Sequence, residues 1–170
     1  MQQRLVEIGE WLKVNGDAIY ETWPSARSCQ YTQGAAPARR LDHAHSFQVA
    51  YRVMDLIGVE PRDGVARIEM FFTAKERGNV TYLYAISVGF PHGHLIIKDV
   101  ETSAATQVHM LGWEQALMFE HDGADVTVHV PITHPKQLPC SHAYTFRLSH
   151  AKHVLKRENH DNNERAHHDL

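Results

Sequence analysis

Val80-Thr81-Tyr82-Leu83-Tyr84-Ala85-Ile86-Ser87-Val88-Gly89 is the stretch that decides the fold of this chain. From Val80 to Val88 bulky side chains occupy every second position and a second set alternates with them, which is the period of a β-strand. Another β-favouring run lies upstream at residues 68–73, and Lys75-Glu76-Arg77-Gly78-Asn79 between the two has the composition of a turn. The two runs therefore predict an antiparallel hairpin.

Further short strands are predicted after this hairpin. Pro91-His92-Gly93-His94 breaks the alternating run, and His121-Asp122-Gly123 predicts another turn. Five β-favouring runs follow the first break, at residues 95–97, 108–112, 116–119, 126–130 and 144–148. Six or seven short strands separated by turns predict a mainly β fold, an antiparallel β-sandwich with one core between two sheets. We expect Tyr82 and Tyr84 to be buried in that core.

An amphipathic helix is predicted to precede the strands. Its apolar face consists of Leu5, Val6, Ile8, Trp11 and Leu12, and its polar face of Glu7, Glu10 and Lys13. We expect Gly16 to end it in the left-handed conformation. Met1-Gln2-Gln3 offers no N-cap residue, which suggests the end of a longer element. Because an isolated helix of about fifteen residues is marginal in water, its apolar stripe is expected to dock on a partner.

Length and composition exclude several classes of protein. The 170 residues, 43% hydrophobic and 22% charged, suit one globular domain with attachments and are too few for a barrel of about 250 residues. A net charge of −3 gives no electrostatic attraction to nucleic acid or to an anionic membrane. No apolar run approaches the roughly 20 residues that a membrane span needs, and the charged, amphipathic start is not a signal peptide.

Cysteines and histidines leave alternatives open. Cys29 and Cys140 are either free thiols or, in an oxidising compartment, a long-range disulfide. His43-Ala44-His45 and His92-Gly93-His94 have a spacing that places both imidazoles on one face of a strand. Neither pair brings the third ligand that zinc needs, so we predict surface histidines, no metal site and no cofactor.

A series of motifs follows the predicted helix in a fixed order. They are Glu7-Ile8-Gly9-Glu10-Trp11-Leu12-Lys13-Val14-Asn15-Gly16, Phe72-Thr73-Ala74-Lys75, Tyr84-Ala85-Ile86 with Pro91, Met110-Leu111-Gly112, Leu117-Met118-Phe119, Gly123, Val128-His129-Val130-Pro131 and Ala143-Tyr144-Thr145-Phe146-Arg147-Leu148. This order resembles the last barrel helix and the C-terminal β-sandwich of α-L-fucosidases, glycoside hydrolase family 29. The resemblance covers residues 4–24 and about 65–149. Trp23 departs from it, because the family has arginine there, and so does Phe119, where it often has tryptophan.

The resemblance implies a division of the chain into four parts. Residues 1–24 would be the terminal helix and exit segment of a catalytic barrel that the chain lacks, and residues 65–149 the β-sandwich domain. Residues 25–64 are longer than the family's link and match no part of it; within them, residues 47–59 are compatible with a helix. Residues 150–170 form a polar, His-rich tail.

The same resemblance implies an accessory function. The parent enzyme would hydrolyse terminal α-L-fucose with retention and without a cofactor, in the lysosome or after secretion. Retaining glycosidases need two carboxylates about 5–5.5 Å apart, and in this family the barrel supplies both. We therefore predict no catalytic residue here and interpret the acidic side chains as solvated or turn-forming: Glu7, Glu10, Glu69, Glu114, Asp122 and Asp125.

Two kinds of partner follow from these interpretations. The expected partner of Leu5, Ile8, Trp11 and Leu12 is the missing barrel or another copy of the chain. The alternative function is a free-standing β-sandwich that binds a carbohydrate or a protein, with Trp23, Trp113, Tyr82 or Tyr84 stacking on sugar rings.

One short motif concerns modification rather than binding. Asn79-Val80-Thr81 matches the N-glycosylation acceptor pattern and falls in the predicted hairpin turn. The pattern also arises by chance, and its use requires entry to the secretory route.

Overall fold

The computed structural model describes residues 2–31 and 68–154. It begins with α1 (Gln2–Asn15) and the 3₁₀ turn η1 (Gly16–Ala18) and includes a second 3₁₀ turn, η2 (Pro135–Gln137). The strands are β1 (Trp23–Tyr31), β2 (Ile68–Arg77), β3 (Val80–Val88), β4 (His94–Ile97), β5 (Val100–Glu101), β6 (Gln107–Met110), β7 (Ala116–Leu117), β8 (Phe119–Asp122), β9 (Asp125–His129), β10 (Ala143–Ser149) and β11 (Lys152–His153). The predicted helix at residues 47–59 and the pair His43 and His45 lie outside the described residues.

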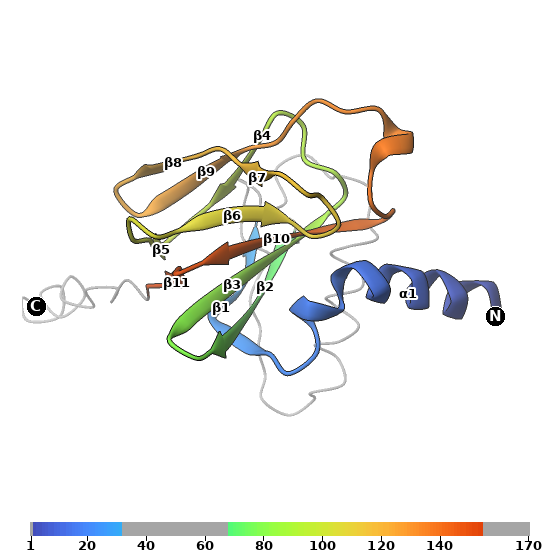
Figure 1. Ribbon diagram of the computed structural model, residues 1–170, viewed down its shortest axis with the longest axis horizontal. Coiled ribbons are helices and arrows are strands. Elements are labelled where there is room, and N and C mark those ends of the chain that lie inside the picture. Colours follow the sequence, from blue (N-terminus) through green and yellow to red (C-terminus); the bar gives the residue numbers. More distant parts are fainter. Residues whose placement is uncertain (1, 32–67, 155–170) are drawn as a thin grey trace, which may run out of the picture.

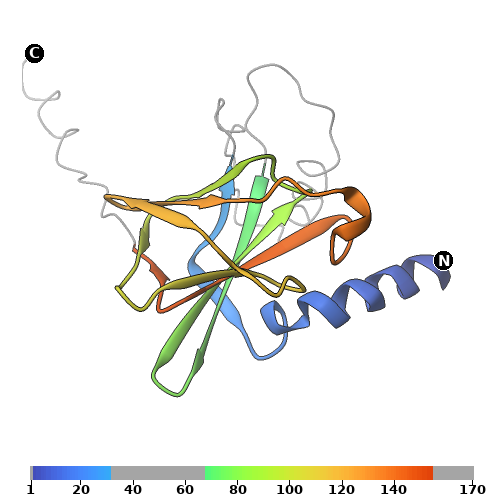
Figure 2. The same ribbon diagram turned by 45° about the horizontal axis from the view of Figure 1, so that its top comes forward.

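Antiparallel pairing joins the strands into two main layers. The larger sheet has the order β1-β2-β3-β10-β6-β7, and the smaller one the order β4-β9-β8. Figures 1 and 2 show the smaller sheet on one side of the larger and α1 on the other. β11 and β5 pair with each other in a separate two-stranded sheet. The predicted mainly β fold, an antiparallel sandwich with a helix in front, is confirmed.

The core lies between the two sheets. The larger sheet contributes Met70, Phe72, Leu83, Ala85, Val108, Met110, Phe146 and Leu148, and the smaller one Leu95, Ile97, Val126 and Val128. Strand register explains the set, because Phe72 pairs with Ala85 and Ala85 with Phe146, so their side chains share one face. Burial of this continuous apolar surface is the main force that holds the sheets together.

The predicted hairpin is present, but its buried face differs from expectation. Leu83 and Ala85 face the core, whereas Tyr84 is buried on the opposite face of the sheet, where it meets η1. Tyr82 on that same outer face is half-buried, with the guanidinium of Arg147 5.7 Å from its ring centroid. Tyr84 is therefore buried as expected, although on the outer face and not between the sheets, whereas the expectation that Tyr82 is buried was wrong. The alternation of side chains along a strand defines two faces of the sheet, but it does not identify the one that points into the core.

Gly16 also differs from its predicted role. It begins η1 instead of ending α1 in the left-handed conformation. The ring of Tyr20 packs over it, so that a Cβ at this position would lie 2.7 Å from Cε2 of Tyr20 and would displace the ring. The left-handed residue that follows the helix is Glu21, with φ of 57°.

Some strand boundaries differ from the sequence-based ones. β2 continues to Arg77, which leaves Gly78 and Asn79 as the turn. The run 116–119 is divided between β7 and β8, and β8 extends through Asp122, so His121 and Asp122 are strand residues and the turn begins at Gly123.

β1 was not predicted from the sequence. It lies at the edge of the larger sheet and pairs with β2 through an irregular register between Pro24 and Cys29. A proline is tolerated there because an edge strand does not need every N–H for the ladder. The irregular register also explains why residues 23–31 lack the period-two pattern on which strand prediction depends.

Candidate docking site

Asp17 lies over three neighbouring side chains on the outer face of the larger sheet. Thr73 of β2, Tyr84 of β3 and Arg147 of β10 are opposite one another in the strand register and therefore form a row across that face. The Tyr84 hydroxyl donates to Oδ2 of Asp17 at 2.7 Å, and the Thr73 hydroxyl donates to the Ala18 carbonyl at 2.7 Å. These bonds fix the exit of α1 on the middle of the sheet.

Positive side chains complete the environment of Asp17. Arg77 Nη2 lies 2.9 Å from Oδ1 and Lys75 Nζ 3.3 Å from it, while Arg147 approaches Oδ2 at 3.9 Å. Lys75 is itself buried and also donates to the Tyr20 carbonyl. Burial by itself raises the pKa of Asp17, but the hydrogen bonds from Tyr84 and Lys75 and the nearby Arg77 outweigh it and hold the pKa below its usual value. The carboxylate therefore stays charged and holds the exit of α1 on the sheet. Asp17 together with Tyr84, Lys75, Arg77 and Arg147 is called the Asp17 joint below.

A second group of contacts attaches the C-terminal half of α1 to the sandwich. The indole N–H of Trp11 donates to the Ala143 carbonyl at 2.8 Å, and the Asn15 amide donates to Sγ of Cys140 at 3.4 Å. Burial raises the pKa of the Cys140 thiol, which keeps it protonated. Gly112 packs here without a side chain, because a Cβ would lie 2.8 Å from Val14 Cγ1.

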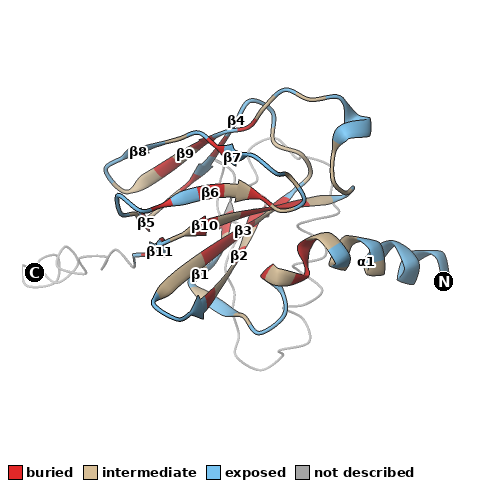
Figure 3. Ribbon diagram, in the orientation of Figure 1, coloured by how far each residue is buried: buried red, intermediate tan, exposed pale blue. Residues whose placement is uncertain are grey.

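The N-terminal half of α1 extends beyond these contacts. Figure 3 shows the helix changing from buried at its C-terminal end to exposed along its first turns. Leu5, Val6 and Ile8 are 66%, 59% and 54% exposed, whereas Trp11 and Leu12 are half-buried. Of the four residues predicted to meet a partner, Leu5 and Ile8 are thus freely accessible, and Trp11 uses its indole N–H to hold the helix on its own sandwich. Leu5, Val6 and Ile8 are called the apolar helix surface below.

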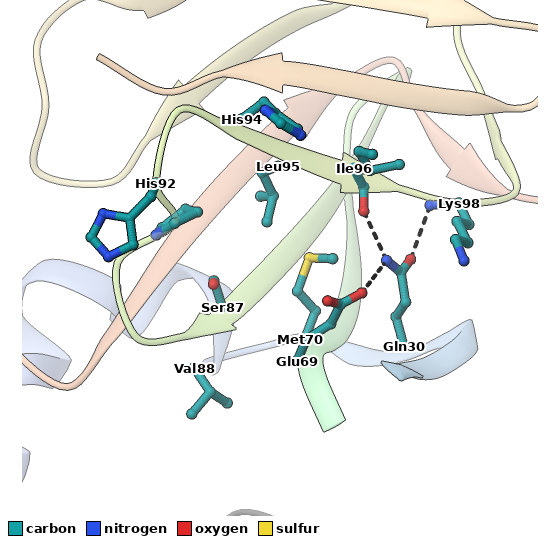
Figure 4. A pocket seen from close by; sticks show the side chains of 11 residues that line it. Gln30, Glu69, Met70, Ser87, Val88, His92, His94, Leu95, Ile96 and Lys98 are labelled. Carbon is teal, nitrogen blue, oxygen red and sulfur yellow. Dashed lines mark hydrogen bonds between the residues drawn. The ribbon is translucent and has the colours of Figure 1, made fainter. Parts of the chain in front are cut away.

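A cleft of about 380 Å³ opens at one end of the sandwich, among β1, β2, β3 and β4 (Figure 4). Gln30 organises it: its amide donates to Glu69 Oε1 at 2.7 Å and to the Ile96 carbonyl at 2.8 Å, and its oxygen accepts from the backbone N–H of Lys98. Among the described residues that line the cleft, Glu69 contributes the one carboxylate. The described lining therefore does not supply the pair of carboxylates that a retaining glycosidase needs.

The other acidic residues considered from the sequence have ordinary positions. Glu7, Glu10, Glu114 and Asp122 are exposed. Asp125 accepts a hydrogen bond from the backbone N–H of Asp99 at 3.2 Å. Sequence reasoning did not single out Asp17, whose side-chain hydrogen-bond partners come from strands 58 or more residues away in the chain. No local pattern could have shown that these strands converge on it.

Histidines and cysteines do not converge in the part of the chain that the structure describes. His92 and His94 are both exposed, and His94 begins β4 while His92 precedes it. In residues 2–31 and 68–154 no group of three His, Cys, Asp or Glu side chains could hold a metal ion. Cys29 and Cys140 are free thiols, in agreement with the first of the two predicted alternatives.

The aromatic side chains that could stack on a sugar are mostly covered. Tyr84 is buried, Tyr82 lies beneath Arg147, and Trp113 packs against the core. Trp23 on the edge strand β1 is 46% exposed. Within the described residues, no helix combines the length and apolar character that crossing a bilayer would require.

The described residues thus form an antiparallel sandwich, and the contacts of Asp17 hold α1 so that its apolar helix surface points away from the core. The model of the alpha-L-fucosidase C-terminal domain family matches residues 65–149. The chain belongs to this family. The resemblance inferred from the order of the sequence motifs is therefore confirmed.

Curated relatives agree with this assignment. The chain is 28% identical over 149 residues to an alpha-L-fucosidase of Branchiostoma floridae and 27% identical over 150 residues to a tissue alpha-L-fucosidase of Mus musculus. These matches cover 86% and 87% of the chain but 25% of each relative, so the chain spans about a quarter of their length. A solved structure of the Thermotoga maritima alpha-fucosidase in complex with fucose matches with 24% identity and a TM-score of 0.46, over 86% of this chain and 26% of that one.

Proposed function

We propose that this chain braces the catalytic barrel of an α-L-fucosidase through the apolar helix surface. The assembled enzyme would hydrolyse terminal α-L-fucose from glycoconjugates with retention, in the lysosome or outside the cell. The barrel would provide both catalytic carboxylates, and this chain would provide rigidity. The observation that carries the proposal is the exposure of Leu5, Val6 and Ile8 on a helix whose other end is fixed to the sandwich.

The energetics favour a partner on this surface. A helix of 14 residues has little stability in water, and its first turns make few contacts with the sandwich. Removing three large apolar side chains from water contributes about 1.5–3 kcal/mol for each fully buried side chain. The relatives indicate what kind of partner this is. They are about four times as long as this chain, and the three quarters of their length outside the match would include the barrel.

The Asp17 joint suits a brace. It holds the exit of α1 by hydrogen bonds and ion pairs from three strands, so the helix leaves the sandwich in one direction. A fixed direction reduces the entropy lost on docking and therefore strengthens binding for the same contact area.

Binding to a barrel tests the proposal. The chain is mixed with the catalytic barrel of a family α-L-fucosidase prepared without its own C-terminal domain, and the dissociation constant is measured by calorimetry. The double variant Leu5→Lys, Ile8→Lys should weaken binding at least tenfold. The double variant Gln3→Lys, Glu10→Gln makes the same change in net charge, by adding one positive charge and removing one negative charge at exposed positions on the polar side of the helix, and it should bind like the wild type.

Two results would contradict this function. One is equal binding by both double variants, which would place the contact elsewhere. The other is hydrolysis of p-nitrophenyl α-L-fucoside by the isolated chain, with activity lost when a carboxylate of this chain is replaced. Such activity would show that the sandwich carries the chemistry itself.

A further inference from the structure

The geometry of the β2–β3 hairpin points to a modification site, and we propose that Asn79 carries an N-linked glycan. This inference rests on the part of the proposed function that places the protein on the secretory route. It does not depend on the docking of α1. Asn79-Val80-Thr81 is the one Asn-X-Ser/Thr pattern among the 170 residues, so a single modified position is expected.

Asn79 occupies the second position of a two-residue hairpin loop. Arg77 pairs with Val80 across the strands, which leaves Gly78 and Asn79 as the loop. Gly78 has φ of +59°, whereas Asn79 is not among the residues with positive φ. This is the arrangement of a type II′ turn, which has glycine at its first central position and places no such restriction on the residue type at the second. Asn79 is therefore not needed to form the turn.

The surroundings of the loop leave room for a large substituent. Residues 76–79 are all exposed, and a Cβ placed on Gly78 would have no atom within 4 Å apart from those of its two chain neighbours. In Figures 1 and 2 the hairpin projects from the body of the sandwich, pointing away from the first turns of α1. A glycan at Asn79 would stay in water and would leave the apolar helix surface accessible.

The third residue of the motif lies in regular structure next to the loop. Thr81 is opposite Glu76 in the β2–β3 ladder and is half-buried. Its β-branched side chain suits a strand, so Thr81→Val keeps both shape and β-propensity while it removes the hydroxyl. This gives a variant that should fold like the wild type but lack the acceptor pattern.

The chemistry requires one co-reactant, an oligosaccharide linked through pyrophosphate to a membrane lipid. The side-chain nitrogen of Asn79 forms a bond to the anomeric carbon of the first sugar. The bond from that carbon to the pyrophosphate oxygen breaks, the lipid pyrophosphate leaves, and the amide loses one proton. No oxidation or reduction occurs, and the amide nitrogen remains uncharged.

Translocation of the full chain into microsomes tests the proposal. The chain is translated behind a cleavable secretion signal, and only protease-protected molecules are analysed, so untranslocated chains do not contribute. We expect a mobility shift that peptide N-glycosidase removes, with the modification found by mass spectrometry on the peptide containing Asn79. Asn79→Gln and Thr81→Val should lose the shift, whereas Thr81→Ser should retain it.

The outcomes separate this inference from the proposed function. Translocated wild-type chain without the shift would overturn the glycosylation site, whatever the barrel-binding experiment shows. A shift that persists in Asn79→Gln would also overturn it. Glycosylated chain that fails to bind a barrel would instead contradict the docking function and leave Asn79 as a glycosylation site.

Discussion

The hydroxyl of Tyr84 donates a hydrogen bond of 2.7 Å to Oδ2 of Asp17, and this bond joins the exit of α1 to the middle of the larger sheet. Burial and the bond to Asp17 both raise the pKa of Tyr84, so the hydroxyl remains a donor at any physiological pH. Asp17 in turn stays charged because its own pKa is lowered. The two groups therefore form a stable, charge-assisted contact between distant parts of the chain.

Replacing Asp17 should destabilise the protein markedly. Asp17→Asn keeps the shape but removes the nearer of the two carboxylates beside the buried Lys75 and leaves only the exposed Glu21 at 3.6 Å, so we expect a loss of about 2 kcal/mol in the free energy of unfolding. Tyr84→Phe should cost about 1 kcal/mol, and the two losses should not add, because both variants break the same hydrogen bond. Urea denaturation measures them. Asp122→Asn, at an exposed strand end, is the control and should lie within about 0.5 kcal/mol of the wild type.

Gly112 should be more sensitive than another glycine with the same backbone conformation. Gly112 has φ of +79°, and a Cβ there would lie 2.5 Å from Cβ of Pro139. Gly123 has φ of +64° but open space around it. Gly123→Ala should therefore cost about 1 kcal/mol from backbone strain alone, and Gly112→Ala more than about 2 kcal/mol. Equal shifts in the two thermal denaturation midpoints would show that the close packing of Gly112 against Pro139 and Val14 does not matter.

Trp11 should control how firmly α1 is attached. Trp11→Phe keeps an aromatic ring but removes the hydrogen bond to the Ala143 carbonyl. We expect the free energy that holds α1 on the sandwich to fall by about 1 kcal/mol. Hydrogen exchange in residues 2–15 should rise, while exchange in β3 and β10 should not change. Ile8→Ala removes an exposed side chain and should leave exchange near wild type in the isolated chain. Faster exchange throughout the sandwich of Trp11→Phe would mean that the helix and the core unfold together.

Acid should weaken the packing of the C-terminal strand β11 through His153. Its Nδ1 lies 2.8 Å from the Ser25 hydroxyl, its ring packs edge-on against Phe72 at 4.4 Å, and it is buried. Burial, with a smaller contribution from Arg27, lowers the pKa of His153 from 6.5 to about 4, against an opposing effect of Asp99. The unfolded state therefore binds a proton that the folded state does not between these two values.

The sign of the pH dependence follows from this difference. The contribution of the neutral His153 is fully present above pH 6.5 and is lost as the pH falls towards about 4, with a total on the order of 3 kcal/mol. The free energy of unfolding should thus decrease over this interval. His153→Gln should remove that part of the slope while the other histidines still titrate. Identical slopes for variant and wild type would show that His153 has the same pKa in the folded and unfolded protein.

The strand pattern could be predicted because it depends on local chemistry. The alternation from Val80 to Val88 and the turn residues Gly78 and Asn79 gave the β2–β3 hairpin, and helical spacing gave α1. β1 could not be predicted in the same way. Its irregular edge register places Gln30 in the buried interior, where hydrogen bonds from other segments satisfy it. Those partners, among them Glu69 and the Ile96 carbonyl, are distant in sequence and leave no local signal.

By itself, the sequence determined which segments form strands, where they turn, and which enzyme family the order of the motifs resembles, because each of these depends on neighbouring residues. Only the tertiary structure decided which face of β3 points into the core and which carboxylate holds the exit of α1 on the sheet. From its strand pattern Tyr84 is expected in the core, but in the folded chain it lies on the outer face of the sheet, where η1 covers it. Asp17 has the sequence context of a linker residue, but in the folded chain Tyr84, Lys75 and Arg77 surround its carboxylate. Pairing across strands brings these groups together, and strand pairing is a property of the folded chain.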